Sequence, residues 1–195
     1  YEYRRESKRR KVEEQNRLYD LLQSATQKQI NRISALTQEY RRISKSDTDR
    51  VKMLLAEIAV LCSYIKRRKH LTLLADKDYE VAVSELERAF SESLQTLKLL
   101  NVRNTLYVDS ELSALSGKNA AAILDFYEEV IEADLENLTS VQISLANING
   151  LRLSLNVCCE ADLSIFLNKG NVLYEMDDDA GYQHLVFIIE GGAAV

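Results

Sequence analysis

The chain has 195 residues, of which 46% are hydrophobic, so it can bury a real core as one large domain or two small ones. It has a net charge of −5, six glycines and no proline, and this composition favours long uninterrupted helices. Three cysteines without a C-x-x-C pair and two distant histidines argue against a zinc site and favour reduced thiols. Without a run of about 18 apolar residues, no membrane-spanning segment is expected here.

The net charge hides a division of the chain. Residues 1–72 carry 18 Lys and Arg against 9 Asp and Glu, whereas residues 73–195 carry 7 against 21. This asymmetry predicts two regions with different surroundings, which we place at residues 1–75 and 76–195. The opening "YEYRRESKRRK" is typical of a segment just cytoplasmic of a transmembrane helix, and equally of a solvated helix end.

The first region begins with a long apolar stripe. Its members recur at steps of four and three and predict one helix of 32 residues from Val12 to Ile43, roughly 48 Å long at ~1.5 Å per residue. They are Leu18, Leu22, Ala25, Gln29, Ile33, Leu36, Tyr40 and Ile43. "SKSDTDR" at 44–50 interrupts the pattern, and Asp47 or Thr48 is a suitable N-cap for a following helix.

A second stripe follows the interruption, so an antiparallel hairpin is expected. Its members are Val51, Leu54, Leu55, Ile58, Leu61 and Ile65. A two-helix hairpin buries only one side of each stripe, which predicts a homodimer that forms a four-helix bundle.

"YIKRRKH" at 64–70 is a dense basic run inside this region. It lacks interleaved aromatic residues and precedes an acidic region, so no nucleic-acid partner is expected. We interpret it as a solvated helix face whose aliphatic stems cover apolar surface, with docking of an acidic partner as the alternative.

The second region alternates helix and strand patterns. Residues 84–99 and 117–138 read as helices, the latter with Ile123, Phe126, Val130 and Ile131 inward, and residues 104–110 read as a strand. Asn149-Gly150 joins the alternating runs 141–145 and 151–157 and is a strong hairpin signal, because both turn positions need a positive φ. Residues 171–176 and 182–189 add two strands across the acidic turn "DDDAG". The order predicts an α/β sandwich with a largely antiparallel sheet and helices on one face, hence an α+β chain.

The predicted hairpin carries "QNRLYD" at 15–20 and "EIAVLCSYIKRR" at 57–68, and an acidic sandwich follows it. This arrangement resembles the cytoplasmic half of a sensor histidine kinase of a clostridial-type branch. The resemblance covers nearly the whole chain. It implies a dimerising hairpin with a phosphate-accepting histidine and a Bergerat-type ATP-binding fold. It also implies a cytoplasmic location tethered to the membrane in the full-length protein, and a response regulator or another kinase as partner.

The phosphate-accepting position departs from this family. Tyr19 and Asp20 occupy the family's His-Asp position, and Tyr19 is expected to be exposed. With a pKa near 10, tyrosine does not replace neutral imidazole as the nucleophile. The two histidines, His70 and His184, lie beyond the hairpin turn. We therefore expect no catalytic residue.

The nucleotide-binding positions depart as well. Glu128 and Glu132 stand where the family's helix offers Glu and a magnesium-binding Asn, and Asp162, at the adenine-reading position, lacks the glycine that should follow. Gly170 is the single glycine between Val157 and Asn171, whereas a phosphate-binding loop needs several. Gly191-Gly192 follow the last strand without a helix, and the acidic "EMDDD" lacks the pattern of a dedicated calcium loop. We expect no metal and no cofactor.

These observations favour a degenerate sensor histidine kinase homologue in two-component signalling, acting by dimerisation or partner binding. An active kinase with a shortened site, using ATP and Mg²⁺, is one alternative. A structural dimerisation module outside the family is another. Retained Glu128 favours the first two over the third, and the missing histidine and glycines favour degeneracy.

Overall fold

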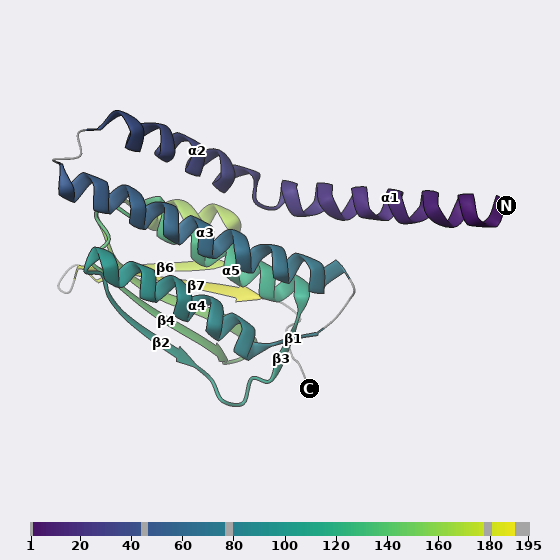
Figure 1. The fold of residues 1–195 in the computed structure, drawn as a ribbon. Coiled ribbons are helices and arrows are strands. Elements are labelled where there is room, and N and C mark those ends of the chain that lie inside the picture. The colour runs from purple at the N-terminus through teal and green to yellow at the C-terminus, as the bar shows by residue number, and fades with distance from the viewer. Residues whose placement is uncertain (1, 44–46, 77–79, 178–180, 190–195) are drawn as a thin grey trace.

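The computed structural model describes residues 2–43, 47–76, 80–177 and 181–189 (Figure 1). The α-helices are α1 (Glu2–Ser24), α2 (Gln27–Arg42), α3 (Thr48–Asp76), α4 (Val83–Leu97) and α5 (Gly117–Ala133). The strands are β1 (Glu80–Ala82), β2 (Arg103–Val108), β3 (Ala114–Ser116), β4 (Ser140–Asn147), β5 (Leu151–Cys158), β6 (Val172–Asp177) and β7 (Tyr182–Ile189). Two 3₁₀ helices complete the set, η1 (Lys98–Leu100) and η2 (Leu163–Lys169). The acidic turn at 178–180 and Gly191-Gly192 lie outside the described residues.

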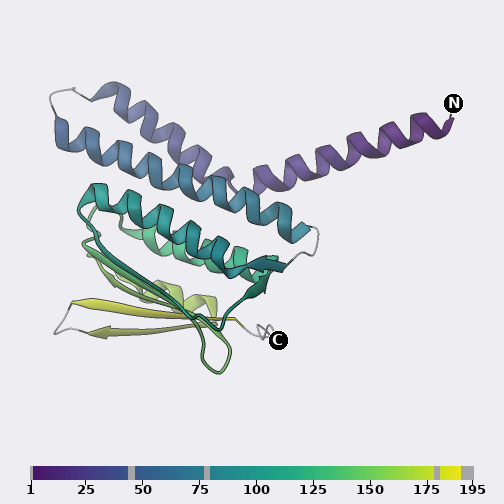
Figure 2. The ribbon, with the colours of Figure 1, turned by 60° about the horizontal axis from the view of Figure 1, so that its bottom comes forward.

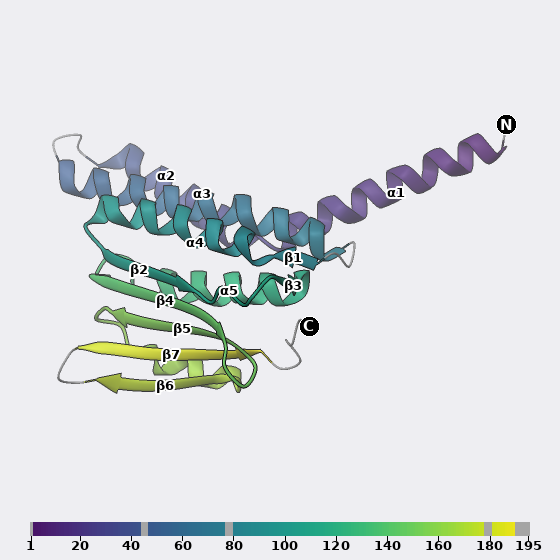
Figure 3. The same cartoon turned by 90° about the horizontal axis from the view of Figure 1, so that it is seen from below.

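The elements form three layers, which confirms the predicted α+β class. Figure 2 shows the α2–α3 hairpin on the outside, α4 and α5 in the middle and the sheet beyond them. Figure 3 shows the same order from another side, and in all views α1 projects away from the layers. One face of the sheet is therefore covered by helices, as the sequence predicts.

The sheet has the strand order β2-β4-β5-β7-β6, with β2 and β4 parallel and every other neighbouring pair antiparallel. The predicted Asn-Gly hairpin is present, since Asn149 and Gly150 have φ angles of 53° and 113° between β4 and β5. Alternate residues of β5 are fully buried, as expected for a strand with one covered face. The short β1–β3 ribbon and η2 were not predicted.

The first predicted helix is wrong in one respect, because it breaks at Ala25–Thr26 instead of running from Val12 to Ile43. Thr26 is fully buried, and its hydroxyl donates to the carbonyl of Leu22 at 3.1 Å. Such back-bonding to the i−4 carbonyl bends helices. The apolar steps continue through the break, so periodicity alone does not reveal it.

The hairpin itself agrees with the sequence. Leu36, Leu54 and Leu61 are buried together in the α2–α3 seam. Asp47 caps α3, because its Oδ1 accepts the backbone N–H of Arg50 at 3.2 Å.

The inner face of the hairpin is covered by the same chain. Val60, Tyr64 and Leu71 of α3 belong to one core with α4, α5 and the sheet. Gly117 at the start of α5 lies so close to α3 that a Cβ there would stand 2.5 Å from the Cα of Ala75. The chain itself therefore covers this face, which the sequence predicts a second hairpin to cover, and the homodimer stays a prediction. The division at residues 75 and 76 falls at the end of α3 and stays a prediction.

Opposite charges join the two regions. Lys28 binds Glu132 at 2.8 Å, Arg50 binds Glu136 at 2.8 Å and Arg68 binds Asp125 at 2.5 Å. The basic hairpin and the acidic sandwich are complementary surfaces within one molecule.

Candidate functional site

The phosphate-accepting position lies on the projecting helix. Tyr19 is 66% exposed on α1, and Asp20 beside it is exposed too. His70 lies on α3, and His184 lies on β7, where it lines a polar depression of about 650 Å³ with Gln142, Asn156 and Tyr182. Neither histidine therefore lies on α1, the helix that carries Tyr19.

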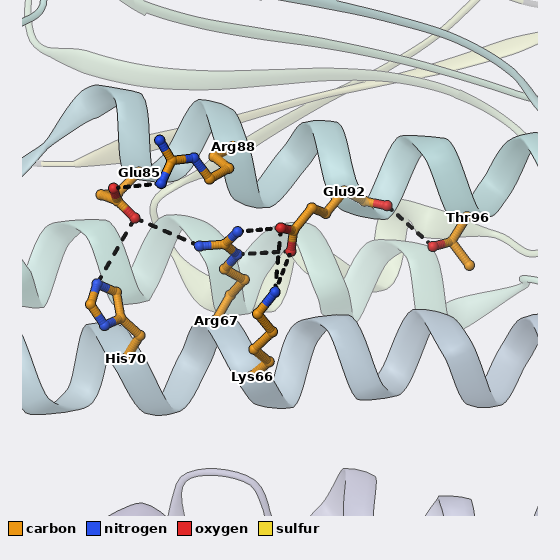
Figure 4. Close-up of polar contacts among 7 residues, drawn as sticks. All are labelled: Lys66, Arg67, His70, Glu85, Arg88, Glu92 and Thr96. Carbon is orange, nitrogen blue, oxygen red and sulfur yellow. Dashed lines mark hydrogen bonds and ion pairs between the residues drawn. The ribbon is translucent and has the colours of Figure 1, made fainter.

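His70 belongs to a polar cluster that joins α3 to α4 (Figure 4). Arg67 donates to Glu92, and this hydrogen bond lowers the pKa of the Glu92 carboxyl. Glu85 lies 3.2 Å from Arg88, 3.6 Å from Arg67 and 3.9 Å from Nε2 of His70.

The predicted solvated face at 64–70 is therefore wrong for its two arginines. The Arg67 and Arg68 side chains are only 12% and 17% exposed, and both pair with acids of the same chain. The acidic partners of these two arginines are Glu92 of α4 and Asp125 of α5 in the same chain. Sequence reasoning missed this because the acids come from helices tens of residues away.

Glu128 and Glu132 lie on the face of α5 that meets the hairpin. Glu132 accepts hydrogen bonds from Gln29 and Lys28, each at 2.8 Å. Glu128 is 2% exposed, and among the described residues its Oε1 has no hydrogen-bond partner. Burial, reinforced by Glu132, raises the pKa of Glu128 well above the usual carboxyl value. This face of α5 therefore packs on the hairpin, with Glu128 enclosed between them.

Asp125 extends the same face one turn earlier. Its Oδ1 accepts the hydroxyl of Tyr64 at 2.9 Å as well as the guanidinium of Arg68. Burial and the Asp125 charge raise the pKa of Tyr64. The stripe Asp125–Glu128–Glu132 is thus used for packing one layer on another.

Asp162 serves as a helix cap. Its Oδ1 accepts the backbone N–H of Ser164 at 2.9 Å, and hydrogen bonds from Ser164 lower the pKa of Asp162. The helix that follows, η2, ends at Gly170, whose φ of 77° closes it with the left-handed conformation that glycine tolerates. The lone glycine therefore ends a helix.

The side chains of η2 fill the space beside α5. Leu163 is fully buried and Phe166 is 7% exposed. The Phe166 ring meets Phe126 edge-on at 5.7 Å, and Phe126 stacks on Phe187 of β7 at 4.6 Å. This aromatic cluster was not predicted, because the 3₁₀ helix has no periodic pattern of its own.

A cavity of about 490 Å³ opens between α2, α3, α5 and η2. Three cations lie at it or close by, and each has an acid at 2.8 Å: Lys28 with Glu132, Arg32 with Glu57, and Lys169 with Glu129. These cations are already neutralised, so the cavity is a poor host for phosphate groups. Asp162 is used as a cap and Glu128 is enclosed against the hairpin, so this arrangement does not fit Mg·ATP.

The outer face of the hairpin, the face turned away from α4 and α5, carries an apolar strip. Leu55, Ile30 and Tyr40 are 48%, 37% and 38% exposed. The exposed members of the strip are Ile30 and Tyr40 of α2 and Leu55 and Cys62 of α3, and the half-buried Ile33, Thr37, Val51 and Ile58 lie between them at steps of three and four. The predicted α3 stripe thus divides, since Leu54 and Leu61 are buried in the seam with Ile58 packed against it, Ile65 packs against the main core, and Leu55 is exposed.

Within the part of the chain that the structure describes, no three His, Cys, Asp or Glu side chains form a group that could hold a metal. No helix among those residues combines the length and apolar character needed to cross a membrane.

No family model and no curated protein matches this sequence. Solved structures do resemble it. The histidine kinase domain of the blue-light activated kinase EL346 from Erythrobacter litoralis has a TM-score of 0.48 and 12% identity, covering 83% of this chain and 94% of that one. A bacterial phosphotransferase has a TM-score of 0.46 and 9% identity, covering 87% and 92%.

Acinetobacter baumannii histidine kinase AdeS has a TM-score of 0.39 and 10% identity, covering 84% of this chain and 96% of that one. The likeness to all three is one of fold.

Proposed function

We propose that this chain is the cytoplasmic portion of a sensor histidine kinase homologue in two-component signalling. It acts by dimerisation or partner binding, with a response regulator or another kinase as the partner. In the full-length protein it is tethered to the cell membrane. Nucleotide turnover is not part of its action.

The observation that carries this proposal is the use made of the nucleotide-binding positions. Asp162 caps η2, and Phe166 of η2 packs on Phe126. Glu128 is enclosed against the hairpin. Opening such a site to ATP would mean exposing a packed aromatic cluster and separating α5 from the hairpin that covers Glu128, and the loss of packing costs free energy.

The outer strip of the hairpin supports dimerisation. Exposed Leu55 lies in a series of apolar residues that runs along both helices, which is the pattern of a helix-bundle seam. A second copy that presents the same strip would bury both, as in the two-fold interfaces of most homodimers.

The nucleotide proposal is tested by titration calorimetry of the dimer with Mg·ATP up to millimolar concentration. No saturable heat is expected, and no acid-labile phosphate should appear on the protein after incubation with labelled ATP. A dissociation constant well below a millimolar would overturn the proposal in favour of an active kinase with a shortened site.

Dimerisation is tested by sedimentation at micromolar concentration. The wild type is expected to be a dimer, and Leu55→Asp is expected to give folded monomers because Leu55 lies outside the α2–α3 seam. The matched control is Leu173→Asp, a comparably exposed leucine on the open sheet face. A monomeric wild type would overturn the dimer.

A further inference from the structure

A cleft of about 630 Å³ lies where the first turns of α3 face η1. Its walls are Asp49, Lys52, Met53, Leu55, Leu99 and Leu100. Leu99 is 71% exposed, although leucines of the same helix layer such as Leu97 are fully buried. Two leucines that line one cleft and stay in solvent indicate a surface that a partner covers.

The cleft is continuous with the outer strip of the hairpin, because Leu55 belongs to both. A bundle partner placed on the strip would therefore reach η1 as well. This makes a second copy of the chain the occupant to consider, and the argument rests on the proposed dimer.

The position of each residue along the hairpin axis indicates which part of the second copy would lie next to the cleft. Arg50 donates to Glu39 at 2.9 Å and Arg32 binds Glu57 at 2.8 Å, so the last turn of α2 lies level with the first turns of α3. In a dimer whose two-fold axis runs along the bundle, equivalent residues of the two copies share one height. The last turn of α2 from the second copy is then level with the cleft.

The chemistry of that turn suits the cleft. Tyr40 is 38% exposed and offers an aromatic ring for Leu55 and Leu99, with a hydroxyl that can remain at the polar rim. Arg41 is exposed next to it, and the cleft carries both exposed Asp49 and exposed Lys52. An ion pair between Arg41 and Asp49 at the rim, with Lys52 left in solvent, would favour this placement of the turn.

We infer that the cleft between α3 and η1 receives the Tyr40–Arg41 turn of a second copy. The dimer interface thereby extends from the helical hairpin onto the sandwich, so that each copy's η1 is held by the other copy's α2.

The test is disulfide cross-linking between two differently tagged variants, Tyr40→Cys and Leu99→Cys, mixed and allowed to exchange subunits. Both carry Cys62→Ser and Cys158→Ser, while burial raises the pKa of Cys159 to about 11 and keeps its thiol slow to react. Mild oxidation is expected to give a heterodimer band at least about tenfold stronger than Tyr40→Cys mixed with Ile148→Cys. Ile148 is 59% exposed in the β4–β5 turn and serves as the matched control.

A second measurement uses Leu99→Ser in sedimentation. The dimer dissociation constant is expected to rise about tenfold, while the thermal stability of the monomer stays unchanged because Leu99 is mostly exposed. A wild-type dimer that shows no band above the control overturns this inference and leaves the proposed dimer standing. A monomeric wild type overturns both.

Discussion

Glu128 behaves differently in the folded chain from a carboxyl group in water. It lies at the layer boundary near Lys28, Asp125 and Glu132, and burial raises its pKa. The folded state therefore holds a proton that the unfolded state releases once the pH exceeds the ordinary carboxyl value of 4.5. By linkage, this group makes the chain less stable as pH rises from that value toward the raised pKa.

Glu128→Gln is expected to remove this component of the pH dependence. The slope of unfolding free energy against pH should become less negative in the variant, by at most about 1.4 kcal/mol per pH unit for one proton. Chemical denaturation at pH 5, 6, 7 and 8 measures it. Exposed Glu160→Gln is the control and should follow the wild type. Parallel curves for wild type and Glu128→Gln would mean that Glu128 is ionised in the fold.

Phe166 is expected to stabilise the fold by packing. Phe166→Ala removes a nearly buried ring from Phe126 and should lower the unfolding free energy by about 3–5 kcal/mol. Neighbouring Ile165, 58% exposed, gives a control in Ile165→Ala, whose effect should stay within about 0.5 kcal/mol. Equal effects at the two positions in a denaturant titration would show that η2 does not pack as described.

For single residues, the sequence predicted which functional groups are missing better than it predicted the contacts of the groups that are present. The missing glycine after Asp162 and the absence of a histidine at Tyr19 are visible in the letters. That Asp162 caps a helix and that Glu128 is enclosed depends on contacts between segments far apart in the chain, for which a single sequence carries no local signal.

Among the secondary-structure elements, the sequence predicted the helices and strands that have a strong apolar periodicity. The elements that it missed share one cause. α4, α5, β4 and β5 have apolar patterns set by one covered face, so their existence follows from spacing. The break at Ala25–Thr26 and the 3₁₀ helix η2 are imposed by tertiary packing. A threonine such as Thr26 is compatible with a continuous helix and with a bend. The burial of Thr26 in the folded chain favours the bend.

The contact between the start of α5 and the end of α3 gives a prediction for these two elements. A Cβ at Gly117 would meet the backbone of Ala75, which cannot move as a flexible side chain would. Gly117→Ala is therefore expected to destabilise the chain by about 1–3 kcal/mol, although alanine favours helices. Thermal unfolding measures it.

Lys118→Ala is the control for Gly117→Ala, since Lys118 is the next residue of α5 and is exposed. Its melting temperature should stay close to that of the wild type. A Gly117→Ala variant at least as stable as the control would show that α3 and α5 are further apart than described.

For the whole molecule, the charge division indicated two regions but not how they meet. The net charges of +9 and −14 predict different surroundings for the two regions, whereas the structure pairs several of these charges with each other. The net charge of a region does not show which of its faces carries the charged side chains. The pairing needs the topology that lays α3 on α4 and α5.

The shared core leads to a last prediction, that the two regions unfold as one unit. Leu71 of α3 is 2% exposed in the same core as the sheet, so Leu71→Ala should lower the unfolding free energy by about 2–5 kcal/mol. Native-state hydrogen exchange is expected to show the same loss in α3 and in β5, because opening either exposes the other. Leu73→Ala, 37% exposed on the same helix, is the control and should change both little. If the loss were confined to α3 while β5 kept its full protection, the hairpin would be a separately unfolding domain, and the ion pairs between the regions would be contacts of a docked domain instead of parts of one core.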